Sequence, residues 1–170
     1  MYPPILKTDR ITLKAYVPEN EDRRVEIDLD PVSTRFMGGS TDDEIQEREA
    51  FRSVFNLYKR NAERWHWVWG IYTDDLLCGH LELKDTVNTN ENELEIVYMI
   101  HPEERRKGIM TDTLLLLKQN QKSWKRRLIA TVSPENTSSI SLLEKIGIDK
   151  KEILVDPESG SETFKLTLAE

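Results

Sequence analysis

One segment, Glu93–Leu117, constrains the fold of this chain more than any other. It begins with the run Glu93–Ile100, which is rich in β-branched and aromatic residues, and continues through a basic loop that ends at Gly108. A helix over Ile109–Trp124 follows, in which Leu114, Leu115, Leu117 and Trp124 are apolar. With the apolar run Leu128–Val132 behind it, this segment predicts a β-α-β unit, which needs a helical crossover within one sheet.

The remaining hydrophobic runs surround this unit with strands and helices joined by short polar turns. The predicted strands are Arg10–Val17, Trp67–Tyr72, Leu77–Lys84, Lys151–Asp156 and Thr163–Leu168, and the predicted helices are Glu19–Leu29, a helix that starts at the capping sequence Ser40–Glu44, and Thr137–Ile146. The order β-α-α-β-β-β-α-β-α-β-β predicts the α+β class. We expect a mixed, mostly antiparallel sheet with helices on both faces, and not a doubly wound parallel sheet.

Composition limits the functions that such a fold can serve. The 170 residues predict a single domain, 1–170. Lys and Arg number 24 against 31 Asp and Glu, and the net charge of −7 argues against a general affinity for nucleic acid or anionic membranes. The single cysteine, Cys78, excludes an internal disulfide and favours a reducing compartment, and no apolar run is long enough to span a membrane. We therefore expect a cytoplasmic protein.

The loop before the central helix is the clearest candidate for a ligand site. The first turn of a helix presents unpaired backbone N–H groups at the positive end of the helix dipole, and this arrangement binds phosphate. Gly108 lets the backbone approach a ligand closely, and Arg105, Arg106 and Lys107 add positive charge. A helix start with solvated basic side chains explains the same residues equally well. The loop is not a P-loop, because its lysine precedes the glycine, and it lacks the glycines of a dinucleotide fingerprint.

The sequence EIVYMIHPEERRKGIM, from Glu95 to Met110, resembles the acyl-CoA-binding motif of the GNAT superfamily of N-acetyltransferases. That motif is a strand followed by Gln/Arg-x-x-Gly-x-Gly/Ala and a helix. Arg105 and Gly108 match its first and fourth positions, whereas Met110 stands where the superfamily prefers a small residue. The match is therefore partial at its last position.

Three further segments resemble parts of the same superfamily, in the expected order along the chain. Thr8–Lys14 and Pro31–Met37 are similar to the branch that contains the ribosomal-protein N-terminal acetyltransferases, and Asn136–Ile148 is similar to the second GNAT motif. The resemblance implies the acyl-CoA N-acyltransferase fold. It also implies transfer of an acetyl group from acetyl-CoA to a primary amine, on either a protein N-terminus or a small molecule.

The resemblance further implies which residues bind the cofactor. The diphosphate of CoA would lie on backbone N–H groups from Arg106 to Met110, with charged contacts from the neighbouring basic side chains. The pantetheine arm would run along the preceding strand, whose backbone can pair with its amides where that strand splays from its neighbour. The residues assigned to the cofactor on this basis are Tyr98, Met99, Ile100, Arg105, Arg106, Lys107, Gly108, Ile109, Met110, Asn136 and Ser139.

Two residues are candidates for catalysis. Glu95 resembles in position the strand glutamate that accepts the amine proton in some GNAT members, and a solvated structural glutamate is the alternative. Glu93 would share its face of the strand. The tyrosine that serves the leaving thiolate in many members is replaced here by Leu143, which leaves Ser139 as the matching hydroxyl. Ser139 has a plainer alternative as a helix-surface residue, and Asn136 has one as a helix cap.

Other features of the sequence point to structural roles. Tryptophans that alternate on one strand, Trp65, Trp67 and Trp69, belong more often to a core than to an acceptor pocket. The three histidines and one cysteine have no metal-ligand spacing, so no metal site is expected. A non-catalytic acyl-CoA-binding or regulatory module with the same fold is the alternative function. A homodimer is left open, and the sequence contains no readable code for the acceptor.

Overall fold

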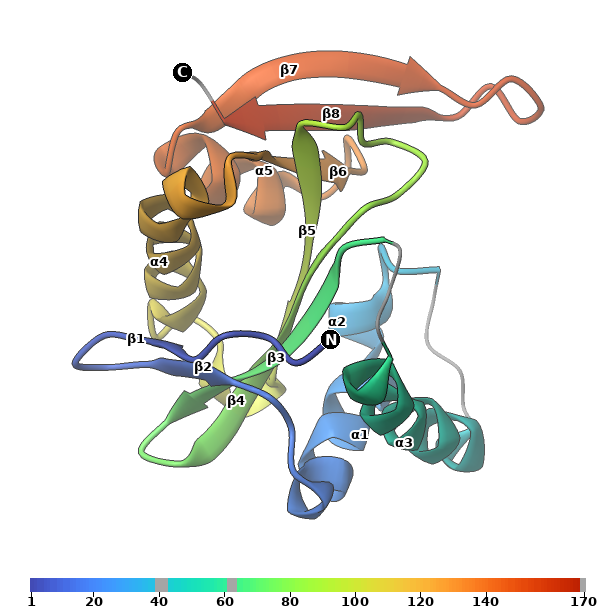
Figure 1. Ribbon diagram of the computed structural model, residues 1–170. Coiled ribbons are helices and arrows are strands. Elements are labelled where there is room, and N and C mark those ends of the chain that lie inside the picture. The colour runs from blue at the N-terminus through green and yellow to red at the C-terminus, as the bar shows by residue number, and fades with distance from the viewer. Residues whose placement is uncertain (39–42, 61–63, 169–170) are drawn as a thin grey trace.

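A sheet of eight strands runs through the computed structural model, which describes residues 1–38, 43–60 and 64–168 (Figure 1). The strands are β1 (Leu6–Lys7), β2 (Thr12–Lys14), β3 (His66–Thr73), β4 (Leu76–Lys84), β5 (Glu93–Ile100), β6 (Arg127–Val132), β7 (Ile148–Val155) and β8 (Glu162–Leu168). They lie side by side in the order β1-β2-β3-β4-β5-β6-β8-β7. Neighbours in this described sheet are antiparallel, except for β5 and β6, which are parallel. The predicted mixed, mostly antiparallel sheet is confirmed.

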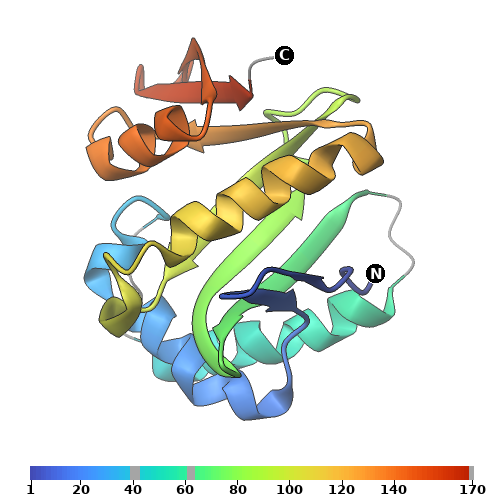
Figure 2. The same cartoon turned by 90° about the vertical axis from the view of Figure 1, so that its left-hand side faces the viewer.

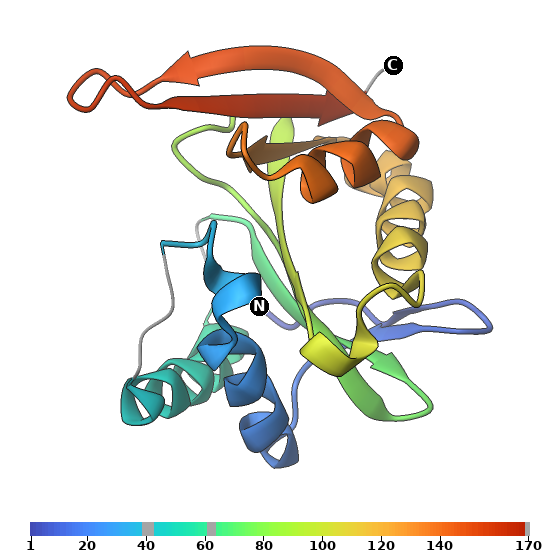
Figure 3. The ribbon, with the colours of Figure 1, turned by 180° about the vertical axis from the view of Figure 1, so that it is seen from behind.

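Helices cover both faces of this sheet, as expected. They are α1 (Glu21–Leu29), α2 (Pro31–Thr34), α3 (Glu44–Lys59), α4 (Ile109–Trp124) and α5 (Thr137–Lys145), with short 3-10 helices η1 (Pro18–Asn20) and η2 (Pro102–Glu104). Figures 1 and 3 show α1, α2 and α3 on one side of the central strands and α4 on the other. Figure 2 shows α4 crossing the sheet. None of the helices in the described ranges has the length and apolar character needed to span a lipid bilayer.

Two hydrophobic clusters fix the helices to the sheet. Leu114 and Leu117 of α4 belong to the cluster that contains Trp67 and Trp69, so the expected core role of these two tryptophans is confirmed. On the opposite face, aromatic residues of α3 pack with residues of β3 and β4, and this second cluster comprises Tyr16, Phe51, Tyr58, Val68, Tyr72 and Leu77. Because helices cover both faces of the sheet, β4 is buried on both sides.

Several element boundaries differ from the prediction. The strand expected over Arg10–Val17 is shorter, because only Thr12–Lys14 pairs with β3 before the chain turns into η1. The short helix α2 was not predicted, and β7 begins at Ile148, before the predicted start. The proposed capping residues 40–42 lie outside the described residues. Within them, the Asp43 side chain caps α3 by accepting a hydrogen bond from the Gln46 N–H, at 3.1 Å.

The parallel pair β5 and β6 separates after three residues, and this positions the site. Their register runs from Glu93 opposite Arg127 to Glu95 opposite Ile129 and then ends. On its other edge, β5 stays paired with β4 as far as Ile100. The carboxyl-terminal half of β5 is therefore held in the sheet on one side only, and a V-shaped cleft opens on the other.

Candidate active site

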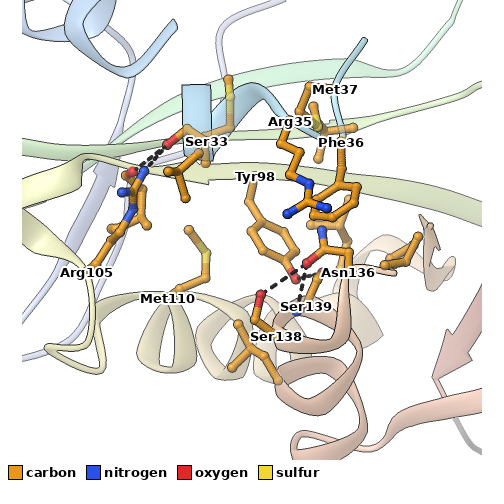
Figure 4. Close-up of a pocket in the computed structure, with 18 of the residues that line it drawn as sticks. Ser33, Arg35, Phe36, Met37, Tyr98, Arg105, Met110, Asn136, Ser138 and Ser139 are labelled. Carbon is orange, nitrogen blue, oxygen red and sulfur yellow. Dashed lines mark hydrogen bonds between the residues drawn. The ribbon is translucent and has the colours of Figure 1, made fainter. Parts of the chain in front are cut away.

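The cleft between β5 and β6 forms part of an open cavity of about 800 Å³, a size typical of ligand sites (Figure 4). Its walls come from β5, β6, the turn before α4, the first turns of α4 and α5, and the segment around α2. Figure 4 shows Arg35 and Phe36, from the segment after α2, facing Asn136 of α5 across it. Three of the four segments that resemble known motifs supply all the labelled residues, and Thr8–Lys14 supplies none of the residues that line the cavity.

At one end of the cavity, α4 begins with a turn that suits an anion. Gly108 is the N-cap, and its φ angle of +79° lies in the left-handed region that favours glycine. The Asp112 N–H donates to the Gly108 carbonyl at 3.1 Å, so the N–H groups of Ile109, Met110 and Thr111 have no acceptor inside the helix. The nearest atom to a Cβ added at Gly108 would be Nη1 of Arg10, at 3.7 Å. The turn is therefore open to a ligand.

The three basic side chains before this turn have different environments. The Arg105 guanidinium donates to the Asp30 carboxylate and, at 2.8 Å, to Oγ of Ser33, so it ties the loop to α2. The Lys107 ammonium pairs with Glu104 at 2.9 Å, and Lys107 is not among the residues that line the cavity. Arg106 lines the cavity and has no ion pair with any described residue. Of the three predicted charge contacts, Arg106 is the one left available for a phosphate.

Arg105 also explains the ionisation of Asp30. Burial raises the pKa of this carboxyl, but hydrogen bonds from the Ser33 N–H and the Arg105 guanidinium outweigh burial and lower the pKa below its ordinary value. The pair therefore remains charged at neutral pH and holds α2 against the cavity.

The backbone of β5 alternates between its two neighbours. The His101 N–H donates to the Cys78 carbonyl at 2.8 Å, so by antiparallel alternation Met99 turns its N–H and C=O toward β4, whereas Tyr98 and Ile100 turn theirs away. The Ile100 carbonyl accepts a hydrogen bond from Ser33 Oγ at 3.1 Å, which agrees with this direction. Tyr98 therefore presents free backbone groups to the cleft, and Met99 is engaged by β4.

The first turn of α5 closes the cavity opposite β5. Asn136 caps this helix, because its Oδ1 accepts a hydrogen bond from the Ser139 N–H at 3.2 Å, and the predicted cap is confirmed. The Ser139 hydroxyl lies 2.6 Å from the Tyr98 hydroxyl (Figure 4). Leu143, one turn further on, is fully buried in the core. The sequence placed Tyr98 at the cavity through its backbone alone; its phenol is a functional group that the sequence analysis missed.

Glu95 stands at the apex of the cleft, on the opposite face of β5 from Tyr98. It is 6% exposed, and its carboxylate accepts hydrogen bonds from the hydroxyls of Thr86, at 2.5 Å, and Thr131. No basic side chain among the described residues pairs with it. Glu93 shares its face, as predicted, but is paired with Lys165 at 2.7 Å and does not line the cavity. Of these two glutamates, Glu95 is the one placed to accept a proton.

The histidines lie elsewhere. Tyr16 and Glu82 flank the buried ring of His80, and Glu26 lies 2.8 Å from His101 Nε2; neither histidine lines the cavity. Burial, and then the charge of Arg24, lower the pKa of His80, so this ring is neutral in the folded protein. Within the described ranges, no group of three or more histidine, cysteine, aspartate or glutamate side chains could hold a metal ion.

Comparison with known proteins places this geometry in a family. Residues 10–149 match the model of the acetyltransferase (GNAT) domain. Comparison with curated protein sequences gave no match. Among solved structures, the GNAT-family acetyltransferase from Bacillus anthracis has a TM-score of 0.78 at 20% identity, with 97% of this chain and 98% of that chain covered.

Two other similar structures are of enzymes whose described substrate is a ribosomal protein. The Salmonella typhimurium acetyltransferase that modifies the N-terminal serine of ribosomal protein L7/L12 has a TM-score of 0.76 at 12% identity, covering 98% of this chain and 100% of that chain. A ribosomal L7/L12 α-N-protein acetyltransferase in complex with coenzyme A has a TM-score of 0.73 at 13% identity, covering 96% and 97%. These likenesses establish the fold, and the expectation of an enzyme rather than a non-catalytic module is confirmed by the family. This chain belongs to the GNAT family of acetyltransferases, which use acetyl-CoA as the acetyl donor.

Proposed function

We propose that the protein transfers the acetyl group of acetyl-CoA to a primary amine, with Glu95 as the group that accepts the amine proton. One observation carries this proposal: the cleft between β5 and β6 has at its open end a turn whose first N–H groups have no acceptor inside the helix, and at its apex a buried carboxylate that forms no ion pair with the described residues. A nucleotide diphosphate and a thioester are the two ends of acetyl-CoA, and the two ends of the cleft suit them in that order.

The residues at the open end fit the diphosphate. The N–H groups of Ile109, Met110 and Thr111 are free to donate to it, Gly108 leaves room for it, and Arg106 adds charge. The amides of the pantetheine arm would pair with the free backbone groups of Tyr98. Met99 lines the cavity but contributes no free backbone group, because β4 uses it.

At the apex, groups of this chain accept the amine proton and stabilise the negative charge that develops on the carbonyl oxygen. The amine nitrogen must be unprotonated when it attacks the carbonyl carbon, and the Glu95 carboxylate takes the proton directly or through a water molecule. The free backbone N–H of Tyr98 points into the cleft, where it can donate to the carbonyl oxygen as negative charge develops. Thr86 and Thr131 fix the orientation of the carboxylate through its two hydrogen bonds.

For the acceptor, we favour a protein or peptide N-terminus over a small-molecule amine. Two of the structurally similar enzymes act on the N-terminus of a ribosomal protein, and an acidic chain of net charge −7 attracts a cationic amine. A cytoplasmic location is part of this proposal. It is supported by the single, buried cysteine, Cys78.

The test is release of CoA thiol in the presence of amines. Incubating the protein with acetyl-CoA and a panel of N-terminal peptides and small amines should show thiol release that depends on one class of acceptor. Glu95→Gln should lower the turnover number by roughly 100-fold to 10,000-fold and leave the affinity for acetyl-CoA nearly unchanged. Glu93→Gln is the matched control, because Glu93 lies on the same strand face but outside the cavity. Equal turnover in the Glu95 variant would remove Glu95 from this role.

A further inference from the structure

A lysine lies directly beside the proposed base. Lys84, on β4, is the cross-strand partner of Glu95, on β5, and such partners share one face of a sheet with their Cβ atoms about 5 Å apart. Opposite charges in these positions attract each other. The Lys84 ammonium instead lies 2.6 Å from Oε2 of Glu82, two residues earlier on its own strand. Glu95 is left with the hydroxyls of Thr86 and Thr131.

The fold fixes Glu82 in the position that holds this lysine. An ionised carboxylate can only accept hydrogen bonds, so Glu82 accepts one from Nε2 of His80, at 3.0 Å, and one from Nε2 of His66, at 3.2 Å. The Tyr16 hydroxyl, 2.8 Å from Nδ1 of His80, fixes that ring in turn. Burial raises the pKa of Glu82, but these hydrogen bonds and the charge of Lys84 outweigh burial and lower the pKa far below its ordinary value. The carboxylate is therefore charged at neutral pH and held in one orientation.

A second lysine reaches this face of the sheet and has two partners. The Lys165 ammonium, from β8, pairs with Glu93 at 2.7 Å and donates to the Asn88 carbonyl at 2.8 Å. Because a main-chain carbonyl also holds it, Lys165 should stay in place when the charge of Glu93 is removed. The Lys84 ammonium has no second partner of this kind among the described residues, so its position depends on one carboxylate.

We infer that Glu82 is a positioning residue that holds the Lys84 ammonium away from Glu95 and so keeps the proposed base free of a neighbouring cation. The inference rests on the proposed function, because the position of Lys84 affects the reaction only if Glu95 accepts the amine proton. A carboxylate beside an ammonium is stabilised in its ionised form and is therefore a weaker base. An ammonium at this point would also repel a cationic amine as it approaches.

Release of CoA thiol tests the inference, with acetyl-CoA and the peptide or amine of the panel that reacts fastest. Glu82→Gln keeps the size of the side chain but removes the charge that holds Lys84. The turnover number should fall by roughly 3-fold to 30-fold, because the released ammonium weakens the base. Lys84→Met alone should leave the turnover number nearly unchanged, and the double variant should recover most of the loss. Removal of Lys84 would not rescue a purely structural defect at position 82.

A crystal structure of the Glu82→Gln variant is the second readout, and it needs no acceptor. The Lys84 ammonium should lie within about 4 Å of the Glu95 carboxylate. If Lys84 stays away from Glu95, or the double variant recovers nothing, the inference is wrong and the proposed function stands. If Lys84 reaches Glu95 and the turnover number does not change, Glu95 is not the base, and it is the proposed function that fails.

Asp75→Asn is the matched control. It removes the carboxylate that pairs with Lys14 at 2.7 Å, and neither residue lines the cavity, so the turnover number should be unchanged. Circular dichroism shows whether each variant is folded. Lys84→Met decides the matter even if Glu82→Gln does not fold. A tenfold loss of turnover in Lys84→Met would mean that the lysine serves the reaction, and it would overturn the inference.

Discussion

Replacing Gly108 with aspartate separates the stability of the turn before α4 from its affinity for an anion. The φ angle of +79° costs an L-residue about 1–2 kcal/mol. A negative charge at the first turn of a helix returns about 0.3–1 kcal/mol through the helix dipole. We therefore expect Gly108→Asp to lower the free energy of unfolding by about 1 kcal/mol, which corresponds to roughly 2–4 °C in Tm for a chain of this size.

The effect on ligand affinity should be much larger. Like charges about 4 Å apart repel by about 1 kcal/mol in water and about 4 kcal/mol at the effective dielectric constant near a protein surface. A carboxylate beside the diphosphate should thus weaken CoA binding by roughly 5-fold to 1,000-fold. Calorimetric titration with CoA measures this, and the loss should shrink as salt is added, because the repulsion is screened.

Gly108→Ala is the matched control, since it carries the same backbone strain without the charge. The Cβ would make only an ordinary contact, with Nη1 of Arg10 at 3.7 Å, so the alanine variant should lose stability but keep an affinity close to that of the unaltered protein. If the folded aspartate variant binds CoA as tightly as the unaltered protein, the turn is not the phosphate site. If alanine weakens binding as much as aspartate does, the shape of the turn matters and electrostatic attraction does not.

Three other outcomes are expected. The turnover number of Glu95→Gln should stay below that of the unaltered enzyme at every pH, and unchanged turnover across the pH range would contradict a proton-accepting role. Arg105→Ala should lower the free energy of unfolding by about 2 kcal/mol in chemical denaturation, because its charge-assisted hydrogen bonds to Asp30 and Ser33 are lost. Arg106→Ala should weaken CoA binding and leave the free energy of unfolding unchanged. Folding lowers the pKa of His80 from its ordinary value of 6.5, so at pH values below 6.5 the unfolded chain binds more protons than the folded protein does. The free energy of unfolding should therefore fall as the pH drops through 6.5. In urea titrations at several pH values, His80→Gln should make the free energy of unfolding depend less on pH.

Much of the fold was predictable because local patterns determine it. The central helix begins at Ile109 as expected, and Leu114 and Leu117, three positions apart on one helix face, are buried against the sheet. The burial of β4 on both sides could not be predicted from its sequence alone. Alternation is typical of one buried face, but whether a helix also covers the other face depends on segments far away in the sequence, here α1 and α3.

The sequence predicted which residues belong to the site, but it did not predict which strands and side chains pair with one another there. Sequence similarity placed Glu95, Gly108 and Ser139 along one cleft, yet the end of the β5–β6 ladder at Glu95 depends on a strand more than thirty residues away. The partner of Arg105 could not be predicted either, because Asp30 precedes it by 75 positions. Side-chain pairs of this kind form only when the whole chain is folded, so no local pattern records them.

The alternation of β5 separates the two charges that the reaction creates. Glu95 and Tyr98 are an odd number of residues apart on one strand, so their side chains lie on opposite faces. In the proposed mechanism the amine is deprotonated on the face of Glu95, and the face of Tyr98 meets α5, where the Tyr98 and Ser139 hydroxyls lie 2.6 Å apart. The free backbone N–H of Tyr98 lies in the plane between them, where the carbonyl oxygen would sit. A one-residue shift in the register of β5 would exchange these faces, so the parallel pairing of Glu95 with Ile129 determines both the shape of the cleft and the side of it on which the proposed base lies.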